Sequence, residues 1–333
     1  MQMTPTAAFK ILVLGPNPAF QKVITFDSPV KIGGVNRASH VTQYVGGKGQ
    51  GSAMALQRWN PGIAAVASFL GGDTGQYVED ELAAAGLDQI VQHTAAPTRT
   101  CTTLLCAGED GGTELIDPSG AISEDELAGM LEKIRNYEVA SSVGGIALCG
   151  TVPPGTEALY ASVAKQMEND ESILLLDGHK QVDDLLATGR VDVLKINQDE
   201  AKALTGEPSA EAAAKKLLTA DGAPVRKLLA LTDGPRPAKL FAKSGASWTL
   251  AVPKIECVNA IGSGDVCTAI FLHELVSSAT KKENGSGDAD ADAVDAFAWG
   301  LAAAVARCMH ELPSDATREE VEAMRAKVVI ERS

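Results

Sequence analysis

The stretch VNAIGSGDVCTAIFLHEL (258–275) places a Gly-Ser-Gly-Asp turn directly before a long apolar segment. The apolar side chains that follow recur at the spacing of one helix face: Val266, Ala269, Ile270, Leu272 and Leu275. A helix that begins on small residues leaves its first amide N–H groups unpaired, and an anion can approach them closely. The stretch therefore predicts a phosphate or oxyanion site at the start of a buried helix.

Asp265 is the acidic residue of this turn. A carboxylate is a poor ligand for an anion, but beside one it is well placed to act as a general base. If a hydroxyl lay between Asp265 and a phosphoryl group, the carboxylate could accept its proton while the amides absorbed developing charge. An acid in the first turn of a helix is also ordinary capping chemistry, so the motif alone leaves both interpretations open.

Composition narrows the class of protein. The chain has 333 residues and a formal net charge of -14, which argues against nucleic acid or an anionic membrane as partner. The six cysteines form no CxxC pair and show no zinc-like spacing with the histidines, as expected for buried thiols in a reducing compartment. The first ten residues show no signal peptide, and no run of 18 apolar residues occurs, so we expect a cytoplasmic protein.

Short apolar runs that end in Gly- or Asp-containing turns alternate with helix-like segments. The predicted strands lie in 9–17, 63–73, 144–150, 172–178, 191–200 and 226–234. The predicted helices cover 50–59, 75–86, 123–136, 156–168, 198–205, 209–220, 293–310 and 317–329. This alternation predicts an α/β fold with a mainly parallel sheet and helices on both faces.

Two regions interrupt the alternation. Residues 20–45 read as two or three strands, and residues 98–117 read as a hairpin around GEDGG. Together they could form a small β-sheet lid or an extension of the main sheet. The small, polar and acidic residues of 281–292 predict a solvated, flexible loop.

Two further segments carry polar groups near predicted strand ends. Asn197 and Glu200, in LKINQDEAKALTG (194–206), are three residues apart, a spacing that suits either a capping box or a hydrated Mg²⁺ ion. Lys48 lies in a Gly-rich turn, VGGKGQGSAMAL (45–56), that lacks the spacing of a phosphate-binding P-loop.

In this order, the motifs resemble those of the ribokinase-like (PfkB) family of sugar kinases over about residues 9 to 310. The segments that carry the resemblance are GPNPAF, GGVNRASHVTQYVGGKGQGSA, FLGGDTGQYVEDELAAAGL, TRT, CGTVPPG, LKINQDEAKALTG and VNAIGSGDVCTA. The VNRA…GGKG, TRT and GTVPPG motifs are most similar to the branch of 1-phosphofructokinase and tagatose-6-phosphate kinase. The resemblance implies one kinase domain over 8–333, a doubly wound α/β fold with a β-sheet lid, and homodimers formed through the lid.

The resemblance also implies roles for individual residues. Asp265 would be the catalytic base, and the amides of Ala260, Ile261, Gly262, Ser263 and Gly264 would form an anion hole. Lys195, Thr232, Gly234, Gly262 and Gly264 would lie at the nucleotide, while Asn197 and Glu200 would hold Mg²⁺ through water. The substrate would be bound by Asn17, Gln21, Arg37, Gly46, Gly47, Lys48, Gly51, Arg99 and Asp265, with Arg37, Lys48 and Arg99 holding its phosphate.

The sugar-binding half departs from the family pattern. Gln21 stands where the phosphosugar branch usually has Asp, and Gly51 stands where GGKG-x-N has Asn. We therefore expect an ATP- and Mg²⁺-dependent kinase of a sugar or sugar phosphate whose acceptor site has diverged. Two alternatives remain: a kinase of another small alcohol such as a nucleoside, or a catalytically idle member that binds a metabolite or a partner.

Overall fold

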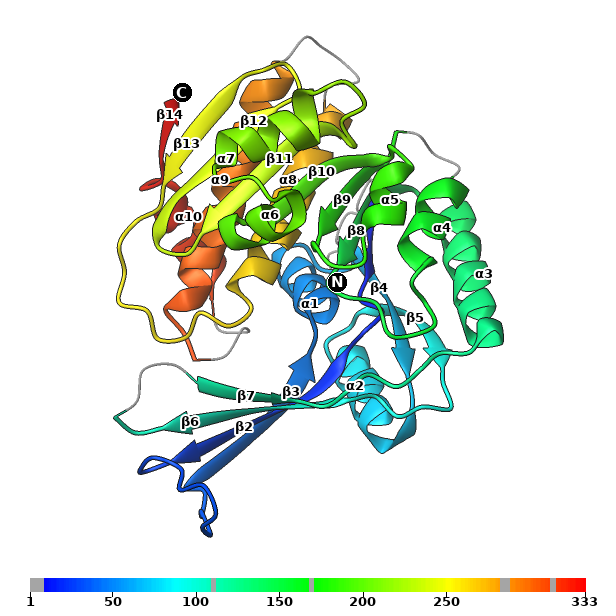
Figure 1. The fold of residues 1–333 in the computed structure, drawn as a ribbon, viewed down its shortest axis with the longest axis vertical. Helices are drawn as coiled ribbons and strands as arrows, with labels where there is room; N and C mark the ends of the chain where they lie inside the picture. Colours follow the sequence, from blue (N-terminus) through cyan, green and yellow to red (C-terminus); the bar gives the residue numbers. More distant parts are fainter. Residues whose placement is uncertain (1–8, 109–111, 168–170, 282–287, 312–315) are drawn as a thin grey trace, which may run out of the picture.

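A large sheet with helices on both faces forms the main body of the protein (Figure 1). The computed structural model describes residues 9–108, 112–167, 171–281, 288–311 and 316–333. Within them the sheet has ten strands, in the order β14 (Val329–Arg332), β13 (Ser247–Ala251), β12 (Arg236–Ala242), β11 (Val225–Asp233), β10 (Val191–Asn197), β9 (Ile173–Asp177), β8 (Val143–Cys149), β1 (Lys10–Leu14), β4 (Ala64–Leu70) and β5 (Asp88–His93). The strands from β11 to β5 run parallel, so the predicted mainly parallel sheet is confirmed.

Alternating side chains of the strands feed two hydrophobic cores, one on each face of the sheet. In β1, Ile11 and Val13 join one core, whereas Leu12 and Leu14 join the other. The first core is covered by α1 (Lys48–Trp59), α2 (Gly72–Ala84), α8 (Ser263–Lys281), α9 (Ala289–Cys308) and α10 (Arg318–Arg325). The second is covered by α3 (Glu124–Ala140), α4 (Leu159–Gln166), α5 (Asp183–Ala187), α6 (Gln198–Thr205) and α7 (Ala210–Ala214), which continues into a π-helical turn at Lys215–Thr219. The doubly wound architecture is therefore confirmed.

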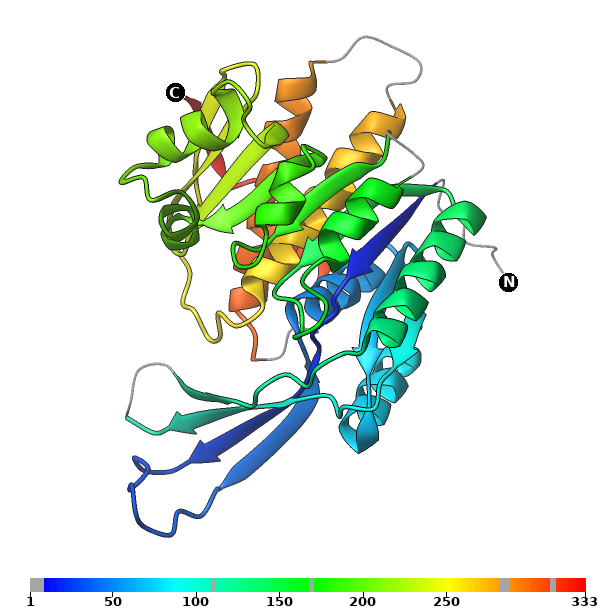
Figure 2. The ribbon, with the colours of Figure 1, turned by 45° about the vertical axis from the view of Figure 1, so that its right-hand side comes forward.

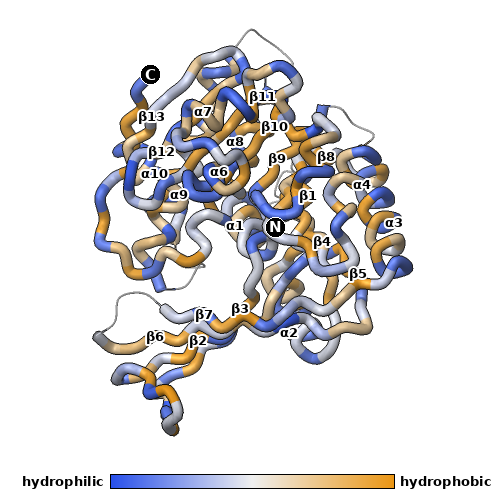
Figure 3. Tube along the Cα trace, in the orientation of Figure 1, coloured by the Kyte–Doolittle hydropathy of each residue, from blue (hydrophilic) through white to orange (hydrophobic). Residues whose placement is uncertain are grey.

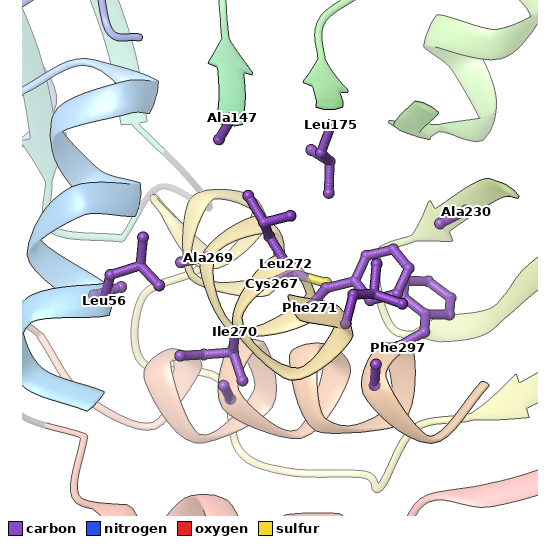
Figure 4. Packing of buried hydrophobic residues seen from close by; sticks show 14 of the residues in the cluster. Leu56, Ala147, Leu175, Ala230, Cys267, Ala269, Ile270, Phe271, Leu272 and Phe297 are labelled. Carbon is purple, nitrogen blue, oxygen red and sulfur yellow. The ribbon is translucent and has the colours of Figure 1, made fainter. Parts of the chain in front are cut away.

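Helix α8 packs within the first core, beside α9 (Figure 4). Phe271 and Leu272 are fully buried, and the ring of Phe271 lies 5.1 Å from that of Phe297 on α9, measured between centroids. The central strands of the main sheet are largely hydrophobic, as the orange segments of the chain trace in Figure 3 show. Among the described residues, no helix has both the length and the apolar character needed to cross a membrane.

A second, smaller sheet stands away from the main one (Figures 1 and 2). Its strands, in the order β3 (His40–Gly46), β2 (Ala19–Phe26), β6 (Thr100–Cys106) and β7 (Gly112–Ile116), come from the two regions that interrupt the strand–helix alternation. Strands β2 and β6 pair in parallel, and the outer pairs are antiparallel. The prediction of a separate small sheet, rather than an extension of the main sheet, is confirmed, and we refer to this sheet as the lid. The turn at 109–111 lies outside the described residues.

The C-terminal part of the main sheet differs from the sequence prediction. A helix was predicted over 317–329, but α10 ends at Arg325 and Val329–Arg332 form β14, which pairs with β13. The antiparallel edge from β11 to β14 was not predicted, because pairing across the edge of a sheet leaves little trace in local periodicity.

The two ends of the predicted loop at 281–292 are helical in the structure. Lys281 ends α8, and α9 begins at Ala289, where the Asp288 side chain caps it by accepting a hydrogen bond from the amide of Asp290. Acidic residues in a first helical turn interact favourably with the helix dipole, so the charge pattern that suggested a loop also suits a helix start. Residues 282–287 lie outside the described part of the chain.

Two glycines bring the start of α1 against the end of β1. A Cβ atom on Gly49 would lie 2.3 Å from the Cα atom of Gly15, so any side chain there would collide with the backbone. Gly47, which precedes α1, has a φ of 114°, a value that L-residues rarely adopt. The Gly-rich turn therefore places Lys48 directly at the carboxyl edge of the parallel strands.

Candidate active site

Polar side chains gather where the central parallel strands end. Asp177 is the last residue of β9 and Asn197 the last of β10, while α1 and α8 begin beside them. Ligands of open α/β sheets bind outside the carboxyl ends of the strands, close to the point where the strand order reverses. This edge of the sheet is therefore the candidate position of the active site.

Asp177 is the centre of a buried charge network. Its carboxylate is 1% exposed and lies 3.2 Å from the Lys48 Nζ atom through Oδ1 and 3.2 Å from the Lys195 Nζ atom through Oδ2. The Thr268 hydroxyl on α8 donates a hydrogen bond of 2.5 Å to Oδ2. Lys195 also donates to the carbonyl oxygen of Gly264, 3.0 Å away. The network thereby links β9, β10, α1 and the first turn of α8.

Mutual attraction outweighs burial for the three charged groups of this network. Burial raises the pKa of Asp177, but Lys195, Lys48 and the hydrogen bond from Thr268 more than compensate and hold the pKa below its ordinary value. Burial lowers the pKa of Lys48 and Lys195, yet the Asp177 carboxylate raises both pKa values above the ordinary range. Both lysines therefore remain cations at the strand ends.

Asp265 lies in the first turn of α8, next to this network. Burial, with a smaller contribution from the Asp177 carboxylate, raises the pKa of Asp265 to about 7, while Lys195 and Lys48 act in the opposite direction. Its carboxylate faces Gly51 on α1, where an added Cβ atom would lie 2.9 Å from Oδ2. Because residue 51 has no side chain, α1 can approach this carboxyl group closely.

The turn before α8 has a geometry that suits an anion, although some of its amides are already paired. Gly262 has a φ of 80°, which favours glycine. The Ile261 amide donates to the Asn259 side chain and the Ser263 amide donates to the Ala260 carbonyl. Within the described residues, the amides of Ala260, Gly262 and Gly264 have no such partner. These three are the members of the predicted anion hole that remain available to a ligand.

Asn197 and Glu200 form a complete capping box at the start of α6. The Asn197 side chain accepts a hydrogen bond from the Glu200 amide, and the Glu200 side chain accepts one from the Asn197 amide. The other oxygen of Glu200 lies 3.7 Å from the Lys48 Nζ atom and 3.4 Å from the His179 Nδ1 atom. Among the described residues, no group of three or more His, Cys, Asp or Glu side chains could hold a metal directly. Mg²⁺ bound through water by these two residues stays a prediction.

A pocket of about 230 Å³ opens at the strand ends. It is lined by Gly15, Asn17, Lys48, Gly49, Gln50, Arg99, Cys149, Gly150, Thr151, Gly178, His179, Lys180 and Glu200. Asn17 donates to the Thr151 hydroxyl at 3.3 Å and accepts from the Ser119 hydroxyl at 2.9 Å. Arg99 donates to the backbone carbonyls of Asn17 and Pro18 at 3.2 and 3.4 Å. Three of the residues predicted to bind substrate therefore share one pocket: Asn17, Lys48 and Arg99.

Other predicted residues lie outside this pocket. Gln21 is on lid strand β2, where its amide donates to the Thr103 hydroxyl at 2.9 Å and its side chain faces Gly46. Arg37 lies in the exposed loop between β2 and β3, so the structure does not bring it together with Lys48 and Arg99.

The residues predicted at the nucleotide lie one strand further along the sheet. Thr232 on β11 pairs in register with Asn197 on β10, and Gly234 follows β11 with a φ of 56°. Lys195 connects this region to the turn of Asp265 through its hydrogen bond to Gly264.

Sequence reasoning missed Asp177 and two neighbouring pocket residues, His179 and Lys180. The signal was present, because Asp177 ends the apolar run SILLLDG and is followed by a turn. An acid at the carboxyl end of a buried parallel strand faces the ligand edge of the sheet, whereas an acid in a surface turn does not. Local pattern could not separate the two cases, since the partners of Asp177 lie 18, 91 and 129 residues away.

Comparison with known proteins identifies the family of the chain. The model of the pfkB family carbohydrate kinases matches residues 17–318. The match covers most of the chain, and the protein therefore belongs to the PfkB family of carbohydrate kinases, which are phosphotransferases.

Solved structures with the same fold include several kinases. Phosphofructokinase-2 from Escherichia coli in complex with fructose-6-phosphate has a TM-score of 0.79 at 20% identity, with 96% of this chain and 99% of that chain covered. A protein from Thermotoga maritima described as a possible 1-phosphofructokinase has a TM-score of 0.79 at 16% identity, with 97% and 99% covered. Ribokinase from Giardia lamblia has a TM-score of 0.77 at 18% identity, with 96% and 99% covered. At these identities the likeness concerns the fold alone.

The buried network predicts a large cost for removing one charge. Asp177→Asn leaves Lys195 buried without its counter-ion, and breaking a buried ion pair in this way costs about 3 kcal/mol or more of the free energy of unfolding. Chemical denaturation at pH 7 measures this cost, with Asp221→Asn, in an exposed loop, as the matched control.

Lowering the pH should reduce the difference in free energy of unfolding between wild type and Asp177→Asn. The pKa of Asp177 is lowered by folding, so its contribution to stability is present above the ordinary Asp pKa and is lost as the pH falls through the folded value. Equal stability of the two proteins at pH 7 would contradict the assigned role of Asp177.

Proposed function

We propose that this protein transfers the terminal phosphoryl group of ATP to a hydroxyl of a sugar or sugar phosphate, with Mg²⁺ as cofactor. The observation that carries the proposal is the placement of Asp265. Its carboxyl group, with a pKa raised to about 7, lies in the first turn of α8, beside unpaired amides and within reach of the charges of Lys48 and Lys195. A group that titrates near neutrality suits a general base under physiological conditions.

In this proposal the residues of the chain divide the reaction between them. Asp265 accepts the proton of the acceptor hydroxyl as its oxygen attacks phosphorus and the bond to the leaving ADP oxygen breaks. The amides of Gly262 and Gly264 and the Lys195 ammonium offset the negative charge that develops on the transferred group. Asp177 takes part indirectly, because it holds Lys48 and Lys195 at the strand ends.

The proposed donor site extends from Lys195 to Thr232 and Gly234. Neighbouring parallel strands end there, with Asn197 opposite Thr232, so a polyphosphate could run along this edge toward α8. Asn197 and Glu200 would hold Mg²⁺ through water, because the capping box uses their direct hydrogen bonds but leaves one Glu200 oxygen facing the pocket. The metal would neutralise part of the phosphate charge.

The pocket supports a small, phosphorylated acceptor. A volume of about 230 Å³ suits one sugar ring better than a nucleoside, since pockets for drug-sized ligands begin at roughly 300 Å³. Lys48 and Arg99 supply cations in a chain whose net charge is -14. The likeness to phosphofructokinase-2, solved with fructose-6-phosphate, is consistent with such an acceptor.

Gly51 and Gln21 make the acceptor site unlike that of the phosphosugar branch. Gly51 packs closely against the Asp265 carboxylate, and the Gln21 amide donates to the Thr103 hydroxyl on the lid. We infer that these two positions change which sugar is accepted. The alternative that they abolish activity is decided by the following experiment.

The test is ADP release from Mg-ATP over a panel of hexoses, hexose phosphates and nucleosides. We expect turnover on a hexose phosphate, and we expect Asp265→Asn to reduce kcat by at least ~10²-fold because it removes the base. Asp73→Asn, which changes an acid in the first turn of α2, is the matched control and should behave as wild type. Binding of ATP without turnover on any acceptor would favour the idle alternative, and near-normal turnover of Asp265→Asn would remove this residue from the role of base.

The lid supports a proposal of self-association. Large apolar side chains are exposed on its strands: Val41, Leu105, Leu115 and Ile116 are 44%, 37%, 54% and 57% exposed. A homodimer formed through the lid would cover such side chains.

Analytical ultracentrifugation should therefore give a mass of twice the 34.6 kDa of one chain. The double variant Leu115→Lys, Ile116→Lys should shift the measured mass toward that of the monomer. Val139→Lys, an exposed apolar position on α3, is the control that should leave the mass unchanged. A monomer at all concentrations would contradict the proposed dimer.

A further inference from the structure

The loop between β9 and α5, residues 178–182, forms one wall of the pocket. Gly178, His179 and Lys180 line it from this side. The loop follows Asp177 directly, so it begins at the centre of the charge network.

This loop has an unusual backbone conformation, which its surroundings hold in place. Gln181 has a φ of 56° and is, within the described residues, the only non-glycine residue with a positive φ. Such a conformation persists where the surroundings impose it, and it is frequent at ligand sites. On one side, Gly178 packs so closely against the loop after β8 that a Cβ atom on it would lie 3.3 Å from the Gly150 carbonyl oxygen. On the other side, Val182 is 1% exposed and its carbonyl accepts the amide of Leu186 in α5.

The basic side chains of the pocket differ in how many of their donors are already engaged. Lys48 is held by Asp177, and Arg99 donates to two backbone carbonyls. His179 faces Glu200, with 3.4 Å between Nδ1 and Oε1. Lys180 is exposed at the pocket and, in the described part of the chain, makes no hydrogen bond or ion pair. Its ammonium group is therefore available to an anion inside the pocket.

A buried acceptor in the same pocket also lacks a partner. Gln50 is fully buried, and its amide nitrogen donates to the Gly15 carbonyl at 2.7 Å and to the Ser68 hydroxyl at 2.8 Å. Its carbonyl oxygen has no hydrogen-bond partner within the described structure. This oxygen is packed against Gly47, where an added Cβ atom would lie 2.3 Å from it, so it belongs to the packing beneath the pocket. Lys180 therefore supplies the unused polar group of the pocket that a ligand can reach.

We propose that Lys180 binds the phosphate that the acceptor sugar already carries, opposite Arg99, and so determines the preference for phosphorylated acceptors. The inference rests on the proposed function, but it concerns a residue to which neither the motifs nor the family pattern assigned a role. The same chemistry could engage a phosphate of ATP instead, and the experiment separates the two sources.

The test compares Lys180→Gln with wild type in steady-state kinetics, varying in turn the hexose phosphate found as substrate, the same sugar without phosphate, and ATP. Loss of a charge-assisted hydrogen bond should raise KM for the hexose phosphate roughly 10- to 100-fold. We expect kcat, KM for ATP and the activity on the unphosphorylated sugar to stay unchanged. Lys180→Arg should restore most of the affinity, and Lys165→Gln, which removes an exposed charge from α4, should have no effect.

Three kinetic results would overturn the proposal. The first is an unchanged KM for the hexose phosphate. The second is an equal rise in KM for the phosphorylated and the unphosphorylated sugar. The third is a rise in KM for ATP alone, which would assign Lys180 to the binding of the phosphoryl donor.

Calorimetry without ATP keeps this test separate from that of the proposed function. Hexose phosphates of the same panel and inorganic phosphate serve as the probes. If the wild type turns nothing over but binds a hexose phosphate more tightly than Lys180→Gln does, the site stands and the kinase proposal fails. If the wild type binds none of these probes, the phosphate site at Lys180 is refuted.

Discussion

The buried carboxylate of Asp177 between two lysines is the interaction on which the site depends. It is the only acid at the strand ends of β8 to β10 that both Lys48 and Lys195 contact within the described residues. Without it, two cations would be brought together at the edge of the sheet with too little negative charge to balance them. With it, Lys48 is held at the pocket and Lys195 is held against the first turn of α8. The same carboxylate raises the pKa of Asp265, which couples the structural charge to the proposed base.

Much of the fold and part of the site could be predicted from local pattern. The Gly-Ser-Gly-Asp turn, the strand–helix alternation and the two lid regions carry their information within short segments, and the structure contains all three. The antiparallel edge and the strand after α10 were missed, because they are set by pairing between distant segments. Asp177 was missed for the same reason: its role comes from three partners that only the folded chain brings to it.

The residues that would bind the acceptor could not be predicted from the motifs alone. Gly51 stands where the family resemblance leads us to expect Asn, and the structure has no room for a larger residue there, since an added Cβ atom would lie 2.9 Å from Oδ2 of Asp265. Arg37 was predicted to hold the substrate phosphate, but in the structure the loop of Gln181 brings a different cation, Lys180, to the pocket. We therefore propose that the residues around the acceptor, more than those proposed for phosphoryl transfer, determine which substrate this chain accepts.

We propose that the surroundings of Asp265 tune its carboxyl group to act as a base near neutrality. The most direct test is a pH titration of its side-chain carboxyl carbon by ¹³C NMR, with Asp265→Asn used to assign the signal. The account predicts a pKa of about 7, far above the ordinary value of 3.8. A titration close to the ordinary Asp value, in a folded protein, would contradict the account.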